Sequence, residues 1–117
     1  MVCFWWLFVV SLGEAQRLVD EWVGRFVEGY WHPLAMLAAL VEEVGELARL
    51  LNALAGPKRP KAGEGVGDLA LELADILFSV ICIANYYGVD LDEAFRRVLE
   101  KYDRRDARRW TPKHRGR

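Results

Sequence analysis

The feature that most constrains this chain is an apolar segment that carries two carboxylates. Within residues 69–84 the polar or charged exceptions are Glu72, Asp75 and Ser79. At helical spacing these three share one stripe of an otherwise hydrophobic helix, which is typical of a buried helix. Burying two ionised carboxylates is costly unless a cation compensates them, and the segment contains no Lys, Arg or His. We therefore expect a bound metal ion to supply the positive charge.

A second group of acids lies on another amphipathic segment, residues 33–56. On a helical wheel Glu43 borders the apolar arc, whereas Glu46 and then Glu42 turn toward solvent. Alone, this triplet is equally consistent with an ordinary solvated helix face. Combined with the acids of the apolar segment, it gives two i,i+3 pairs on two helices, with four oxygen ligands converging on one point. Such a set suits Mg²⁺ or Mn²⁺.

Hydrophobic periodicity predicts four helices and no strand after Ser11. Their expected ranges are 11–29, 33–56, 68–87 and from 90 to an end beyond 109 that the pattern does not define. Ser11 with Glu14 forms a capping-box pattern, and Asp68 and Asp90 are expected N-caps. A loop rich in glycine, proline and lysine separates the second and third helices. The chain of 117 residues is long enough for one domain, so we expect an all-α four-helix bundle.

Both ends of the chain fall outside this helical pattern. Residues 1–10 form an apolar extension that is too short to span a bilayer and lacks the basic start of a signal peptide. They are either a packed extra segment, a partner-binding arm, or residues upstream of the true start. The domain is expected over 11–110, and 111–117 is a basic tail.

The amino-acid composition indicates which partners the protein binds and in which cellular compartment it works. Apolar residues make up 53% of the chain, a surplus that favours a homodimer or homotetramer formed through apolar helix faces. Ten of the 16 Lys and Arg residues lie within 96–117, where an anion is expected. No nucleic-acid-binding pattern accompanies them, and the acids at 72 and 75 exclude a membrane span. Two cysteines, Cys3 and Cys82, give no disulfide framework and fit a reducing cytoplasm.

The two acidic motifs resemble the signature of a known enzyme family. Glu42-Glu43-Val44-Gly45-Glu46 followed by Glu72-Leu73-Ala74-Asp75 is similar to the E-E-x-x-E and E-x-x-D motifs of the MazG-type nucleoside triphosphate pyrophosphohydrolases. Four flanking features agree in order: Trp31-His32-Pro33, the basic loop from Lys58 to Lys61, the stretch 84–91, and Lys101-Tyr102 with Arg105. The likeness covers about residues 11–110, and residues 1–10 have no counterpart in it.

The resemblance implies an enzyme that hydrolyses an NTP or dNTP between the α and β phosphates, giving a nucleoside monophosphate and pyrophosphate. Mg²⁺ would be required, Mn²⁺ would substitute, and the metal ligands would be Glu43, Glu46, Glu72 and Asp75. Glu42 would take or orient the proton of the attacking water. The expected substrate-binding residues are Lys58, Lys61, Asn85, Lys101, Arg105 and Trp31. The role implied is housekeeping of the nucleotide pool.

Alternatives remain at this stage for both the residues and the function. The basic residues of the last helix can pair with acids at i,i+4 as ordinary helix surface, and Asn85 can instead bond to a neighbouring loop. A phosphoribosyl-ATP pyrophosphohydrolase uses a related fold and similar acids. A non-catalytic dimerisation module holding a structural ion has the same spacing.

Overall fold

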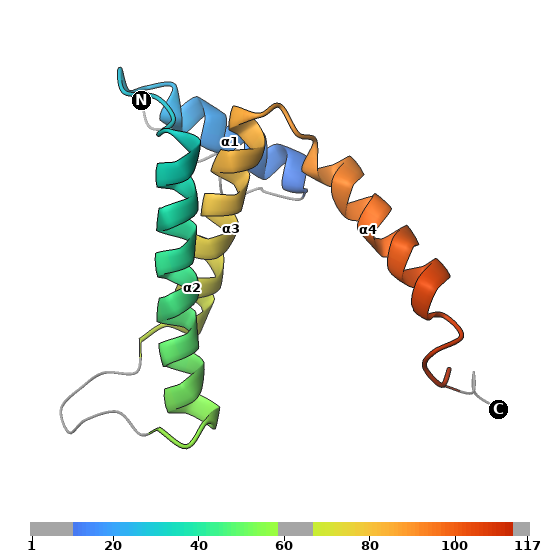
Figure 1. Ribbon diagram of the computed structural model, residues 1–117. Helices are drawn as coiled ribbons and strands as arrows, with labels where there is room; N and C mark the ends of the chain where they lie inside the picture. The colour runs from blue at the N-terminus through green and yellow to red at the C-terminus, as the bar shows by residue number, and fades with distance from the viewer. Residues whose placement is uncertain (1–10, 59–66, 114–117) are drawn as a thin grey trace.

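The structure, a computed structural model, describes residues 11–58 and 67–113. It contains four α-helices: α1 (Leu12–Val23), α2 (Pro33–Ala55), α3 (Leu69–Tyr86) and α4 (Leu91–Asp106) (Figure 1). No strand occurs in the described ranges. The predicted all-α class is confirmed. Residues 1–10, Lys61 and the end of the basic tail lie outside the described residues, so the expectations for them stay predictions.

Side-chain caps explain where the helices begin. The Ser11 hydroxyl accepts a hydrogen bond from the Glu14 amide at 3.0 Å, and Asp68 accepts one from the Leu71 amide at 3.2 Å. Asp90 accepts from two amides at the start of α4. Each bond satisfies a backbone donor that has no partner within its own helix. The three predicted N-caps are confirmed.

The end of α1 differs from the expected one. The helix ends at Val23 with Gly24 as its C-cap, not at Gly29. Beyond Val23 the backbone turns through shorter i,i+3 bonds, such as the one from the Phe26 amide to the Val23 carbonyl at 3.1 Å. Gly24 weakens helix propagation, and Gly29 then reverses the chain with a positive φ of 62°. The residues from 24 to 31 therefore form a turn rather than a last helical turn.

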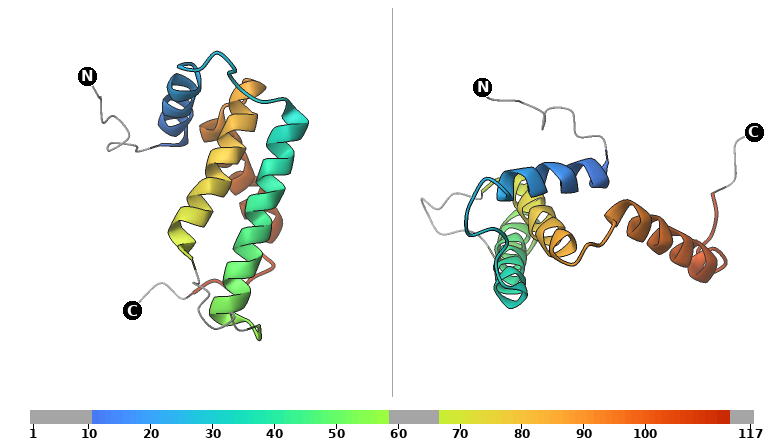
Figure 2. Two further views of the ribbon diagram at one scale, coloured as in Figure 1. Left: turned by 90° about the vertical axis from the view of Figure 1, so that its left-hand side faces the viewer. Right: turned by 90° about the horizontal axis from the view of Figure 1, so that it is seen from above.

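The four helices do not close into a bundle within one chain. Helices α2 and α3 run antiparallel and pack side by side along their lengths (Figures 1 and 2). Helix α1 packs across the end of α3 from which α4 departs, and α4 packs against α1 before it points away from the α2–α3 pair. The expected four-helix bundle is therefore an open arrangement, because nothing in the described part of the chain brings α4 back along α2 and α3.

A hydrogen-bonded corner holds α1, α3 and the start of α4 together. The Asn85 amide donates to the Gln16 carbonyl and to the Tyr30 hydroxyl, both at 2.9 Å, and its oxygen accepts from Gln16 Nε2 at 3.0 Å. Gln16 also donates to the Val89 carbonyl at 2.7 Å and accepts from the Leu91 amide at 2.9 Å. These bonds fix the direction in which α4 leaves the corner.

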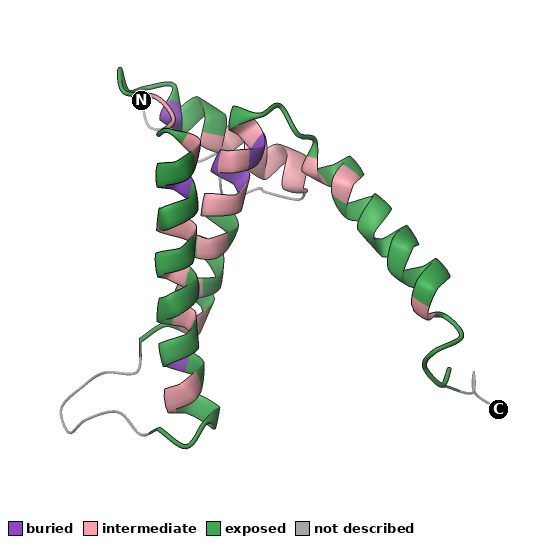
Figure 3. Cartoon of the chain, viewed as in Figure 1, coloured by how far each residue is buried: buried purple, intermediate pink, exposed green. Residues whose placement is uncertain are grey.

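Three helices expose large apolar side chains along one stripe, and Figure 3 shows that much of α2, α3 and α4 is exposed. The stripe of α2 comprises Leu37, Val41, Val44 and Leu51. The stripe of α3 comprises Leu73 and Leu77, and the stripe of α4 comprises Phe95, Leu99 and Tyr102. Helix α3 was expected to be buried on all sides, but the single chain covers it only where α2 and α1 pack. Helix α3 is also long and apolar enough to cross a membrane, by length and composition only. However, Glu72 and Asp75 lie within it, and charged groups are costly in lipid.

Candidate metal centre

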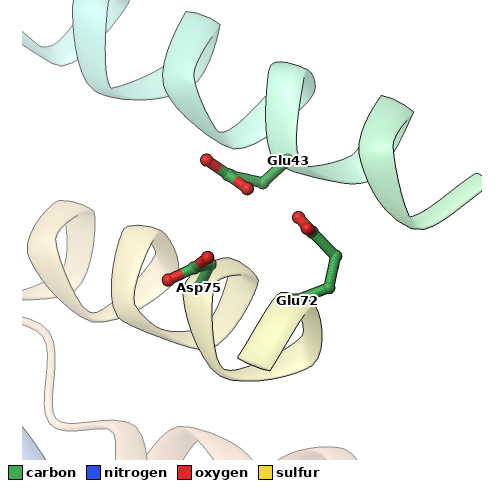
Figure 4. Close-up of side chains that lie close together, drawn as sticks. All are labelled: Glu43, Glu72 and Asp75. Atoms are coloured by element: carbon green, nitrogen blue, oxygen red, sulfur yellow. The ribbon is translucent and has the colours of Figure 1, made fainter. Parts of the chain in front are cut away.

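Three of the predicted ligands meet between α2 and α3. Each of Glu43, Glu72 and Asp75 offers a carboxylate oxygen, and the three atoms lie within 4.8 Å of one another. Figure 4 shows the three side chains pointing toward one another from the two helices. Glu72 and Asp75 stand one turn apart on α3, and Glu43 faces them because it borders the side of α2 that packs on α3. Antiparallel packing thus brings motifs far apart in sequence to one point.

The electrostatics of Glu72 show how strained the cluster is without a cation. A hydrogen bond with Glu43, followed by burial and by the negative charges of Glu43, Asp75 and Glu46, raises the pKa of Glu72 from 4.5 to about 7. Two ionised carboxylates can only accept, so this hydrogen bond needs a proton on one of them. The buried Oε1 of Glu72 has no hydrogen-bond partner among the described residues. A cation would satisfy it.

No basic side chain within 11–58 and 67–113 is paired with these three acids. The ion pairs recorded there are Arg17–Glu21, Arg49–Glu46, Arg105–Asp106 and Arg109–Asp106. Oxygens around one octahedral Mg²⁺, bound at about 2.0–2.1 Å, lie about 2.9 Å apart when adjacent and about 4.2 Å apart when opposite. The three acids, whose oxygens lie within 4.8 Å of one another, would have to move closer to bind one ion together. The donors, all carboxylate oxygens, suit a hard divalent ion.

The structure does not bring Glu46 and Glu42 into the three-acid cluster. Glu46 lies close enough to raise the pKa of Glu72, but its carboxylate accepts a hydrogen bond from Arg49 Nε at 3.2 Å and is 56% exposed. Glu42 is exposed on the solvent side of α2. The fourth-ligand role of Glu46 and the base role of Glu42 stay predictions.

None of the predicted phosphate-binding residues that the structure describes is paired with the three acids. Lys58 is exposed beyond the end of α2, and Lys61 is outside the described residues. Lys101 and Arg105 lie on α4, where each cation sits 4.9 Å from the centre of the Tyr102 ring. Arg105 also donates two hydrogen bonds to Asp106, at 3.0 and 3.1 Å. Because α4 points away from α2 and α3 (Figure 1), its cations do not reach the acids of their own chain.

Asn85 is engaged within the chain. Both donors and the acceptor of its amide are used in the corner between α1 and α3. One of its partners, the Tyr30 hydroxyl, donates in turn to Asp20 at 2.8 Å. Burial, with the nearby Asp20, raises the pKa of Tyr30 to about 12, which keeps that hydroxyl protonated. The observed bonds give Asn85 a role in positioning helices, and its contact with substrate stays a prediction.

A cavity of about 470 Å³ has lining residues one helical turn from two of the three acids. Its walls come from the end of α1, the turn from 24 to 31, the start of α2 and the middle of α3, and they include Trp22, Phe26, Glu28, Trp31, Phe78 and Ser79. Ser79 follows Asp75 by one helical turn, and the lining residue Ala39 precedes Glu43 by one turn. Trp31 was predicted from the sequence to contact substrate, whereas Trp22, Glu28 and Ser79 were not. The aromatic cluster around Gly24 and Gly29 was the available signal.

Comparison with known proteins agrees with this geometry. The sequence model of the MazG nucleotide pyrophosphohydrolase domain matches residues 32–110, which contain the three acids. The chain belongs to the MazG family. In Bacillus subtilis (strain 168), YpjD is 44% identical over 106 residues, covering 91% of this chain and 96% of YpjD. YvdC from the same strain is 30% identical over 102 residues, covering 82% of this chain and 96% of YvdC.

Solved structures of relatives confirm the fold. The crystal structure of B. subtilis YpjD matches with a TM-score of 0.74 and 42% identity, covering 84% of this chain and 98% of that one. The crystal structure of the Bacillus-conserved MazG protein, a nucleotide pyrophosphohydrolase, matches with a TM-score of 0.70 and 41% identity, covering 84% of this chain and 95% of that one. The chain therefore has a MazG-like fold.

Proposed function

We propose that this MazG-family protein hydrolyses a nucleoside triphosphate, an NTP or a dNTP, to the monophosphate and pyrophosphate in a Mg²⁺-dependent reaction. The observation that carries the proposal is the cluster of Glu43, Glu72 and Asp75, with its buried and unpaired Glu72 oxygen. A family described as nucleotide pyrophosphohydrolases supplies the substrate class. The cytoplasm, where nucleotides and reduced thiols coexist, is the compartment that we propose.

The metal ligands in this proposal are Glu43, Glu72 and Asp75, with Glu46 as the fourth. Glu46 lies on α2 one turn beyond Glu43. Its ion pair with Arg49 is exposed and contributes little to stability, so Glu46 would release Arg49 and bind the ion. Mg²⁺ held there would neutralise phosphate charge and would polarise and orient a water for attack on phosphorus. Mn²⁺ has the same preference for oxygen ligands and would substitute.

Glu42 is the proposed proton acceptor. It neighbours Glu43 in sequence but lies on the solvent side of α2, where its carboxylate is accessible to water. The attacking water forms a bond to phosphorus while the anhydride bond between the α and β phosphates breaks. Glu42 accepts the water's proton, directly or through an intervening water, and pyrophosphate leaves.

The cavity beside the metal centre is the proposed site for the nucleoside. Its lining includes several aromatic side chains, among them Trp31, which is 62% exposed. Aromatic walls suit the flat faces of a base. A base in this cavity would leave its phosphates near the acids, because Ser79 and Ala39 lie one helical turn from Asp75 and Glu43. Asn85 would act on this cavity through Tyr30, which lines it.

A second copy of the chain is the proposed source of the phosphate-binding cations. Lys101 and Arg105 do not reach the acids of their own chain, yet α4 exposes an apolar stripe that needs cover. The stripes on α2 and α3 flank the acids and offer that cover. A homodimer or homotetramer with α4 of one copy against α2 and α3 of another would bury the stripes and carry positive charge to the acids. Lys58 and Lys61 are proposed to contact phosphate from the loop between α2 and α3.

The test is a reaction with a panel of NTPs, dNTPs and phosphoribosyl-ATP, each with Mg²⁺ and with chelator, followed by detection of pyrophosphate and of the monophosphate. We expect pyrophosphate from nucleoside triphosphates with Mg²⁺ only. Cleavage of phosphoribosyl-ATP alone would assign the other pyrophosphohydrolase reaction. Release of inorganic phosphate, or no turnover at all, would contradict the proposal.

A further inference from the structure

We propose that Glu28 makes the cavity beside the metal centre selective for guanine nucleotides. This inference rests on the proposed function, because it assigns the nucleoside to that cavity. Of the described residues that line the cavity, Glu28 is the one with an acidic or basic side chain, and the others are aromatic, aliphatic, small or neutral. A single charged group in an apolar site fixes which edge of a ligand it accepts.

The carboxylate of Glu28 is free to bind a ligand. It makes no hydrogen bond or ion pair with another described residue, unlike Glu21 on α1, which pairs with Arg17 at 2.9 Å. Its backbone is held in the turn that closes the cavity, where the Gly29 amide donates to the Phe26 carbonyl at 3.3 Å. Gly29 has a φ of 62°, which other residues rarely adopt, so the direction of the chain after Glu28 is set by the backbone.

The hydrogen-bonding capacity of a carboxylate then decides among the bases. An ionised carboxylate has two acceptor oxygens and no donor. Guanine presents two adjacent donors, its N1–H and its 2-amino group, which one carboxylate can receive together. Adenine and cytosine each present one amino group beside a ring nitrogen lone pair that repels the second oxygen. Uracil and thymine flank their single N–H with two carbonyl oxygens. The order expected is guanine first and the two carbonyl-rich pyrimidines last.

The rings around Glu28 strengthen this preference. Trp22, Phe26, Trp31 and Phe78 leave few competing hydrogen-bond partners near the base, and a hydrogen bond beside apolar walls is stronger than one in water. Bidentate recognition of a base edge discriminates on the order of tenfold to a hundredfold against the wrong base. Because Glu28 is exposed at the rim, we expect the lower end of that range.

The experiment measures binding without turnover. GMP, IMP, AMP, CMP and UMP are titrated into the whole protein in chelator, and quenching of tryptophan fluorescence is followed, since Trp22 and Trp31 line the cavity. IMP keeps the N1–H of GMP but lacks the 2-amino group. We expect GMP to bind about tenfold more tightly than IMP and to bind more tightly than UMP by a larger factor. In Glu28→Gln, whose amide offers one donor and one acceptor, the GMP preference over IMP should vanish.

Glu21→Gln is the matched control, because it neutralises an acid on α1 that does not line the cavity, and it should keep the wild-type order. An unchanged order in Glu28→Gln, no base preference in the wild type, or no binding of any monophosphate would each overturn the inference. Selective GMP binding by a protein that releases no pyrophosphate would overturn the proposed function but not the role of Glu28. Pyrophosphate release with equal efficiency from every base would overturn only the role of Glu28.

Discussion

Glu72 of α3 and Glu43 of α2 place carboxylate oxygens within 4.8 Å of each other, although both side chains are carboxylic acids. A hydrogen bond between them requires a proton that neither group would hold at neutral pH in water. Burial and the surrounding acids act in the same direction, so the pKa of Glu72 rises to about 7. Without a cation the two helices therefore meet through a contact that depends on pH.

This contact predicts a pH dependence of the free energy of unfolding in the absence of metal. Between pH 4.5 and about 7 the folded state holds a proton on Glu72 that the unfolded state releases. Its contribution is therefore fully present below pH 4.5 and is lost as the pH rises through about 7. Glu72→Gln keeps the shape of the side chain without its charge. We therefore expect the free energy of unfolding of Glu72→Gln, relative to that of the wild type, to increase as the pH rises across that interval.

Urea unfolding in chelator at several pH values from 4 to 8 checks this prediction. The quantity compared is the difference between variant and wild type, which removes the contributions of the other titrating groups. Glu21→Gln, an exposed acid on α1, should show no such trend. A difference between Glu72→Gln and the wild type that stays constant with pH would contradict the shifted pKa.

Much of this fold follows from local sequence signals. Ser11, Asp68 and Asp90 cap their helices as expected, because an N-cap bond depends only on residues within the next turn. Glu43 meets Glu72 because periodicity alone places both on the faces that pack together. The direction of α4 was not predictable, since it depends on the bonds that Gln16 makes across the chain.

The same limit applies to the site. The pairing of Glu46 with Arg49 is a choice of side-chain conformation that a helical wheel does not specify. The cavity arises where three helices and a turn meet, so Glu28 and Ser79 are brought together from positions 51 residues apart in sequence. No local pattern marks residues that become neighbours only through packing.

The bonds of Asn85 predict a structural role that mutation can separate from catalysis. Asn85→Ala removes one acceptor and two donors, so one N–H of the Gln16 amide, the Gln16 carbonyl and the Tyr30 hydroxyl each lose a partner, while the Gln16 bond to Val89 remains. We expect a loss of about 1–3 kcal/mol in the free energy of unfolding. Urea unfolding measures it, with Asn52→Ala near the end of α2 as a comparison. A variant with wild-type stability and a raised KM would instead favour a direct contact with substrate.

The exposed apolar stripes predict that the protein assembles. We expect light scattering at micromolar concentration to show at least a dimer, and Val41→Glu, in the middle of the α2 stripe, to shift it toward the monomer. Burying a charge in an apolar interface is unfavourable, so the change should be large. Val27→Glu is the control, because Val27 is fully exposed on the turn after α1. A monomeric wild type would contradict this prediction.

The placement of α4 predicts that active sites are shared between copies. Asp75→Asn should remove metal binding by the acids of its own chain. The double variant Lys101→Ala, Arg105→Ala should remove the phosphate-binding cations of α4. Coexpressed in equal amounts, the two inactive chains should recover about a quarter of wild-type turnover, since half of random dimers are mixed and each holds one intact site. Turnover is measured as pyrophosphate release in the presence of Mg²⁺. If each variant is inactive and the mixture stays inactive, the cations do not act between copies.

The central claim is that Glu43, Glu72 and Asp75 hold the Mg²⁺ that pyrophosphate release requires. The most direct measurement is the melting temperature and the rate of pyrophosphate release for the wild type, Asp75→Asn and the control Glu21→Gln, each with Mg²⁺ and with chelator. We predict that Mg²⁺ raises the melting temperature of the wild type and the control, and that both turn over only with Mg²⁺. Asp75→Asn should keep its fold, lose the Mg²⁺ stabilisation and lose turnover by roughly a hundredfold or more. Full turnover and an unchanged response to Mg²⁺ in Asp75→Asn would contradict the account.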